Sequence, residues 1–270
     1  MMTSSRGRAR IGVLVPFSNI NLEADSALLR PEGVSIHFAR LGGYDLDEIP
    51  DAEQMAGLGA ASLEEPLRLI AGVRPEVILY GCTSATLTHG TAFDRDLAQQ
   101  IKGRTGAHTV TAAGALVHAL KALGVTRVGF ASPYVDDINS LAVSFLTDAG
   151  FECVSQADVG VALGNYGQGE LTPDEVFALG KRADSNDAEA IVLSCTDMRS
   201  VEIIEPLEAA LGKPVITSNQ AMFFEALQLL DIESQQKSLG RLFWQRTNNE
   251  SRAEPSHCIE AGLESYCKPA

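Results

Sequence analysis

The stretch PEVILYGCTS at residues 75–84 decides the fold, because the chain repeats it as AEAIVLSCTD at residues 188–197. Each copy is a short apolar, β-prone run that is followed at once by Cys-Thr. Short apolar runs bounded by turn residues are typical of buried strands in parallel sheets. Cys82 and Cys195 therefore stand at corresponding strand ends in two related parts of the chain.

Two further pairs of segments extend the repeat in the same order. RIGVLVPF at 10–17 matches RVGFASPY at 127–134, and VTAAGA at 110–115 matches ITSNQA at 216–221. Three matches in the same order and at similar spacing indicate an internal duplication. We interpret the sequence as two homologous halves.

Strand-like and helix-like patterns alternate along the chain. The expected strands are IGVLVP, VSIHFAR, EVILYG, HTVTA, RVGFAS, FECVSQA, AIVLS and PVITS. Stretches between them, such as LEEPLRLIAGV and GALVHALKAL, have helical spacing. This alternation predicts an α/β fold of βαβ units, in which mostly parallel sheets are flanked by helices.

We therefore expect two pseudo-symmetric lobes. The first contains residues 8–112 plus 214–230, the second contains residues 113–213, and residues 231–270 form a C-terminal extension that is a candidate for packing on a partner subunit. Ligands of open α/β sheets bind outside the carboxyl ends of the strands. Two facing lobes would bring those ends, with Cys82 and Cys195, to an active site in the interlobe cleft.

Composition narrows the class of protein. A chain of 270 residues with 45% hydrophobic content can bury a sizeable core. Its net charge of −14 disfavours nucleic acid and anionic membranes as partners. The run IGVLVP is too short for a signal peptide or a membrane span, so we expect a cytoplasmic protein.

The remaining cysteines and the Gly-rich segment give no sign of a cofactor. The five cysteines include no CxxC pair and have no histidine at zinc spacing, so neither a disulfide framework nor a metal site is expected. We assign no function to Cys153, Cys258 or Cys267. The segment LGNYGQG lacks a GxGxxG pattern that opens a helix, so no nucleotide site is expected.

Two opposed thiols can perform two-sided chemistry on a small substrate. A cysteine at a helix N-terminus is expected to have a lowered pKa. One thiolate can then attack or take a proton while the other thiol supplies a proton. Thr83, Ser84 and Thr196, with the N–H groups of both turns, are candidates to hold a substrate carboxylate. A redox pair is the alternative, which the absence of a CxxC motif disfavours.

Residues 10–230 resemble the aspartate/glutamate racemase superfamily, whose two α/β lobes each supply a cysteine to the cleft. VPFSNINLEAD at 15–25 is similar to the maleate isomerase branch, and there Asn19 matches a substrate-binding asparagine. Asn19 also fits a simple helix cap. Tyr134 in SPYVDDIN resembles that branch's active-site tyrosine, and Asn165 resembles its second asparagine. The resemblance implies a homodimer or a larger homo-oligomer.

Departures from the family patterns limit the choice of substrate. Amino-acid racemases usually have C-N-T at the first cysteine, where this chain has C-T-S. The G-C-T-S turn looks more like arylmalonate decarboxylases and ectoine-utilisation proteins, but arylmalonate decarboxylases use the second-lobe cysteine alone. Two thiols favour isomerisation or racemisation over decarboxylation.

We predict a cofactor-independent isomerase, either a cis–trans isomerase or a racemase, that acts on a small carboxylate or dicarboxylate through Cys82 and Cys195. An arylmalonate-type decarboxylase is one alternative. A catalytically silent carboxylate-binding protein of a catabolic pathway is the other.

Overall fold

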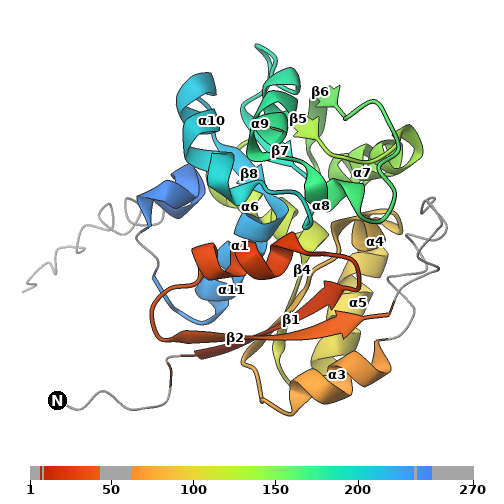
Figure 1. Cartoon of the computed structure of the whole chain (residues 1–270), viewed down its shortest axis with the longest axis vertical. Helices are drawn as coiled ribbons and strands as arrows, with labels where there is room; N and C mark the ends of the chain where they lie inside the picture. Colours follow the sequence, from red (N-terminus) through yellow and green to blue (C-terminus); the bar gives the residue numbers. More distant parts are fainter. Residues whose placement is uncertain (1–6, 8, 43–62, 234–235, 245–270) are drawn as a thin grey trace, which may run out of the picture.

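The computed structural model describes residues 7, 9–42, 63–233 and 236–244, which contain two four-stranded parallel sheets in opposite halves of the molecule (Figure 1). The first sheet has the order β2-β1-β3-β4 and the second the order β6-β5-β7-β8. Their strands are β1 (Ala9–Pro16), β2 (Val34–Leu41), β3 (Val77–Tyr80), β4 (His108–Thr111), β5 (Arg127–Ala131), β6 (Glu152–Ala157), β7 (Ala190–Leu193) and β8 (Val215–Thr217). Each expected strand overlaps one of these, and the same strand order in both sheets confirms the α/β fold with two related parts.

Helices cover both sheets and meet at the junction between them. They are α1 (Asn21–Leu29), α3 (Glu64–Ala71), α4 (Thr83–Leu87), α5 (Gly90–Thr105), α6 (Ala112–Leu123), α7 (Asp136–Asp148), α8 (Gly167–Glu170), α9 (Pro173–Arg182), α10 (Ile204–Leu211) and α11 (Ser218–Leu229), with the 3-10 turns η1 (Val201–Ile203) and η2 (Lys237–Leu239).

The duplication is visible in how the fourth strand of each sheet passes into a helix. Thr111 ends β4 and its hydroxyl accepts a hydrogen bond from Gly114 N at 3.1 Å, which caps α6. Thr217 ends β8 and accepts from Gln220 N at 3.1 Å, which caps α11. Threonine is a favoured N-cap residue because its hydroxyl satisfies a free N–H group of the first turn.

The expected assignment of residues 214–230 to the first lobe is wrong for the strand that this segment contains. Residues 215–217 form β8, which pairs in parallel with β7 of the second sheet. The following helix α11 packs on α6 and also on α1, β3 and β4 of the first half. A shared apolar core, which includes Val13, Val110, Phe130 and Val192, joins both sheets.

The described part of the C-terminal extension packs on this chain itself. Leu239, Leu242 and Phe243 are buried in the shared core, and Gln220 Nε2 donates to Leu239 O at 2.6 Å. Cys258 and Cys267 lie outside the described residues. Among the residues that the structure describes, no helix is long and apolar enough to cross a membrane.

Candidate active site

Cys82 and Cys195 occupy equivalent positions at the ends of the third strands. Cys82 follows β3 and Cys195 follows β7, and both side chains are buried. The backbone before each thiol is held alike: Gly81 N donates to Leu14 O at 2.9 Å, and Ser194 N donates to Ala131 O at 2.8 Å. The repeat in the sequence therefore produces a repeated strand end.

A small cavity of about 40 Å³ lies between the two strand ends. All eight site residues expected from the sequence line it, namely Asn19, Cys82, Thr83, Ser84, Tyr134, Asn165, Cys195 and Thr196. Its other lining residues, which the sequence had not singled out, are Pro16, Phe17, Ser18, Gln168 and Asp197. A space of this size suits a substrate of a few carbon atoms rather than a nucleotide.

The expected lowering of the thiol pKa values is wrong. Burial raises the pKa of Cys82, against the weaker opposing effect of hydrogen bonds from Ala85 N–H and Ser84. Burial raises the pKa of Cys195 to about 12, and the nearby Asp197 carboxylate adds to this rise. Cys82 precedes a helix of only five residues, and Cys195 is followed by a turn, with η1 starting at Val201. The rise in pKa that desolvation causes is therefore larger than any lowering that these short elements produce.

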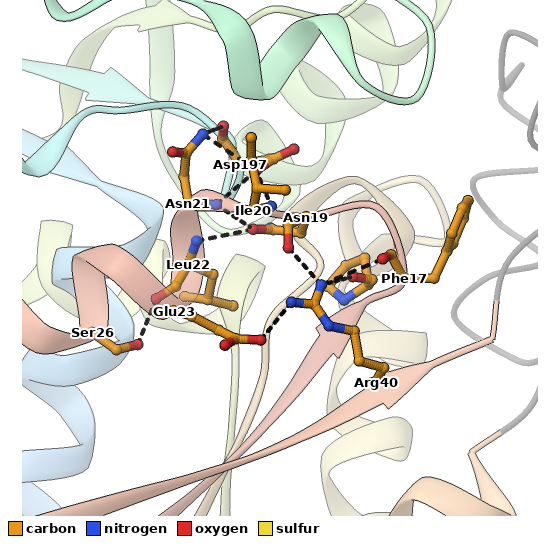
Figure 2. A network of polar contacts seen from close by, with 10 residues as sticks. Phe17, Asn19, Ile20, Asn21, Leu22, Glu23, Ser26, Arg40 and Asp197 are labelled. Carbon is orange, nitrogen blue, oxygen red and sulfur yellow. Dashed lines mark hydrogen bonds and ion pairs between the residues drawn. The ribbon is translucent and has the colours of Figure 1, made fainter.

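The Asn19 side chain bonds both to the start of α1 and to Thr196, which follows the second thiol. Its Oδ1 accepts hydrogen bonds from Asn21 N at 3.2 Å and Leu22 N at 2.9 Å, so it caps the start of α1 (Figure 2). Its Nδ2 donates to Thr196 Oγ1 at 3.0 Å. Asn19 thus connects the start of α1 with the turn that follows Cys195.

The two threonines beside the thiols are bonded within the protein. Thr196 Oγ1 accepts from Asn19 and donates to Gly81 O at 2.8 Å, which links the two strand ends. Thr83 Oγ1 donates to Ser218 Oγ at 3.0 Å, at the start of α11. Their hydroxyl groups therefore hold the site together.

Tyr134 lines the cavity beside Cys195 and Ser84. Its phenol interacts with Cys195 and Ser84, and burial raises its pKa well above the ordinary value, so it remains a neutral donor. Tyr134 N donates to Ser132 Oγ at 3.1 Å, and Asn139 Nδ2 donates to Tyr134 O at 3.2 Å. These bonds fix the loop between β5 and α7.

Asn165, in the loop before α8, and Gln168, within α8, form part of the cavity wall. Asn165 is buried in the cavity wall. Cys195 Sγ donates to Gln168 Oε1 at 3.5 Å, and Gln168 Nε2 donates to Gly164 O at 3.2 Å. Gln168 had no signal in the sequence beyond its place in the Gly-rich segment.

The polar lining of the cavity is made of hydroxyl, amide, thiol and carboxyl groups. Among its described lining residues there is no Arg, Lys or His. Across the described part of the chain, no group of three or more His, Cys, Asp or Glu side chains is placed to hold a metal ion.

Comparison with known proteins gives the family of this chain. The family model described as arylmalonate decarboxylase matches residues 11–243. The chain belongs to the arylmalonate decarboxylase family. This agrees with the resemblance to the aspartate/glutamate racemase superfamily seen in the sequence.

Relatives within and around this family carry two names. A maleate isomerase of Nocardia farcinica is 30% identical, covering 88% of this chain and 97% of the relative. An arylmalonate decarboxylase of Bordetella bronchiseptica is 29% identical, covering 86% of this chain and 95% of the relative. A solved structure of the Nocardia farcinica enzyme superposes with a TM-score of 0.79 at 27% identity, covering 88% of this chain and 98% of that one. That structure is a cysteine-to-serine mutant with a covalently bound succinylcysteine intermediate.

Proposed function

We propose that this protein is a cofactor-independent cis–trans isomerase that acts on maleate or a closely related cis-dicarboxylate. The observation that carries the proposal is the pair of buried thiols, Cys82 and Cys195, on one small cavity. Maleate isomerases are prominent among the relatives, and one of them forms a succinylcysteine intermediate. The chemistry therefore belongs to cysteine-based isomerases.

In the proposed reaction Cys82 reacts as a thiolate and Cys195 as a thiol. The Cys82 sulfur bonds to one olefinic carbon while Cys195 gives its proton to the other, which turns the double bond into a single bond. Rotation about that bond follows. Return of the proton to Cys195 and expulsion of Cys82 then release the trans product. This is nucleophilic catalysis coupled to general acid–base catalysis.

The electrostatics of the cavity support this division of roles. The Asp197 carboxylate lies beside Cys195 and raises its pKa, which favours the protonated thiol. No such carboxylate acts on Cys82, whose pKa is raised by burial. A proton donor at Cys195 and a nucleophile at Cys82 follow from this asymmetry.

We propose that the substrate carboxylates are held by Asn19, Ser84, Tyr134 and Asn165. Tyr134 and Ser84 supply hydroxyl donors, and the remaining amide hydrogen of Asn19 supplies another. Thr83 and Thr196 then act by positioning, since their hydroxyl groups are bonded to Ser218 and Gly81. Hydrogen bonds of this kind to charged groups are stronger than those between neutral groups.

Proton NMR with maleate tests the function directly. We expect the maleate olefinic signal to be replaced by that of fumarate, and both Cys82→Ser and Cys195→Ser to abolish turnover. With maleate, Cys195→Ser should also gain the mass of one maleic acid at Cys82, because a proton from solvent can complete the addition while no thiolate at position 195 is left to remove it for release. Full turnover by either serine variant contradicts the two-thiol mechanism.

Proton NMR with other substrates in heavy water separates the alternatives. Loss of an arylmalonate with release of carbon dioxide identifies a decarboxylase, and solvent deuterium at the α-carbon of aspartate identifies a racemase. Binding of every substrate without chemical change identifies a silent binding protein. Any of these outcomes without maleate conversion overturns the proposal.

We also propose a homodimer or larger homo-oligomer in the cytoplasm. Light scattering coupled to size-exclusion chromatography tests the first point. Cell fractionation tests the second.

A further inference from the structure

The loop from Pro16 to Ile20 joins β1 to α1 and forms one wall of the cavity. We call it the Asn19 loop. On one side Arg40 of β2 fixes its carbonyl groups: Nη1 donates to Pro16 O at 3.2 Å, Phe17 O at 3.3 Å and Asn19 O at 2.6 Å (Figure 2). The guanidinium is itself paired with Glu23 of α1 at 2.5 Å. The loop is thus secured to its own sheet.

On the other side Asp197, from the second half of the chain, binds the N–H groups of the same segment. Its Oδ1 accepts from Ile20 N at 2.8 Å and Asn21 N at 3.0 Å, and its backbone O accepts from Asn21 Nδ2 at 2.7 Å. Figure 2 shows the Asp197 side chain reaching across to these groups. The contacts span about two-thirds of the chain, since Asp197 lies 176 or 177 positions from its partners.

The same residue is also in direct contact with the second thiol. Asp197 N donates to Cys195 Sγ at 3.4 Å, so one residue binds the Asn19 loop through its side chain and Cys195 through its backbone. A shift of the loop away from the second half therefore pulls on the Cys195 turn.

We propose that Asp197 is a positioning residue, a latch that holds the Asn19 loop of one half against the Cys195 turn of the other and so sets the placement of Cys195 relative to Cys82. The latch rests on the proposed isomerase function, because its purpose is to align two thiols on one substrate. A near-attack arrangement is sensitive to displacements of about 1 Å.

Burying the Asp197 carboxylate beside the cavity costs free energy, which supports a specific role for this residue. Asp197 is only 6% exposed and lines a cavity proposed to bind a dicarboxylate, which its charge repels. Buried charges are retained where hydrogen bonds compensate them. The titratable groups that interact with it electrostatically include Arg40 from β2 and Asp25 from α1, and its N–H donors are those of Ile20 and Asn21. The carboxylate is thus directed at the loop rather than at a substrate.

Hydrogen–deuterium exchange tests the latch without any assumption about the reaction. Asp197→Ala removes the acceptor of two amides, so we expect exchange in a peptide that covers Ile20 and Asn21 to speed up at least about tenfold. Asp197→Asn retains an acceptor oxygen of the same shape, and its exchange should stay close to that of the unmodified protein. Glu202→Gln is the matched control, because it removes a nearby negative charge that pairs with Arg199 and not with the loop.

Kinetics with maleate tests the consequence for alignment. We expect Asp197→Ala to lower kcat by about 10- to 100-fold while KM is unchanged or lower, since the carboxylate does not hold the substrate. Asp197→Asn keeps the acceptor oxygen but removes the charge that raises the pKa of Cys195, so it should retain more of kcat than Asp197→Ala. Unchanged exchange in Asp197→Ala overturns the latch, as does an equal loss of kcat in the asparagine and alanine variants.

The outcomes separate the latch from the proposed function. If the unmodified protein leaves maleate unchanged but the exchange results hold, the isomerase proposal fails and the latch stands as a link between the two halves. If maleate is converted and exchange is unaffected by Asp197→Ala, the latch fails alone.

Discussion

At the scale of single residues, the Thr196 hydroxyl links the two strand ends directly. It accepts from Asn19 Nδ2 and donates to Gly81 O, in a fully buried setting. Thr196→Val keeps the shape and leaves both partners unpaired, so we expect a loss of about 1–3 kcal/mol in the free energy of unfolding. Catalytic efficiency should fall about tenfold as the thiols lose alignment.

Urea unfolding and NMR-monitored turnover of maleate measure the two effects. Thr196→Ser retains the hydroxyl and serves as the control, with stability and turnover close to those of the unmodified protein. A serine variant as impaired as the valine variant would show that the methyl group, rather than the hydrogen-bonded link, is what matters.

Also at the residue scale, the sequence could reveal the thiols but not their electrostatics. Cys82 and Cys195 were predictable because each repeats after a matching strand. Their raised pKa values were not predictable, since the effect of full burial on each pKa is larger than the effect of the short turn that follows the thiol. The role proposed for Asp197 rests on contacts with Ile20 and Asn21, which lie far away in the chain. Its place two residues after Cys195 was the only signal available.

At the scale of elements, the strands were predictable because their apolar runs are buried on every side, as in β3 and β7. The placement of β8 was not, because a strand belongs to the sheet with which it pairs, and that pairing is a long-range contact. The third repeat, which matches 110–115 with 216–221, already pointed to the correct sheet. The pattern of apolar residues therefore predicts whether a segment is a strand better than it predicts the sheet in which that strand pairs.

The packing of α9 on the second sheet makes an element-scale prediction at Gly129. A Cβ at Gly129 in β5 would lie 2.1 Å from Ala183 O, a backbone atom at the end of α9. Gly129→Ala must therefore push the helix from the sheet, and we expect a loss of about 2 kcal/mol or more in the free energy of unfolding. Chemical denaturation measures it.

Gly103 provides the matched control for this substitution. It lies inside α5, where an added Cβ meets nothing within 4 Å. Gly103→Ala should stabilise the protein by about 0.5–1 kcal/mol, because alanine is the better helix former. Equal effects of the two substitutions would contradict the close contact between β5 and α9.

At the scale of the whole molecule, Asp25 lies where α1, α11 and the Cys195 turn meet. Asn219 Nδ2 donates to Asp25 Oδ2 at 2.8 Å and to Thr196 O at 3.0 Å, which ties the three elements together. Burial raises the pKa of Asp25 to about 7, against the opposing effect of the Asn219 bond. Of the charges nearby, Glu202 and Asp197 raise the pKa further and Arg199 lowers it.

The junction should therefore make the stability of the whole protein depend on pH. The folded protein keeps the Asp25 proton up to about pH 7, whereas the unfolded chain loses it near pH 4. The free energy of unfolding must then fall as the pH rises from 4 to 7 and become independent of this group above 7.

Asp25→Asn, which cannot ionise, should reduce the fall by on the order of 1 kcal/mol or more. Urea unfolding at pH 5 and pH 7.5 measures it, with the exposed Asp148→Asn as control. An equal fall in the unmodified protein and in Asp25→Asn would mean that other buried carboxyl groups, such as Asp197, set the pH dependence.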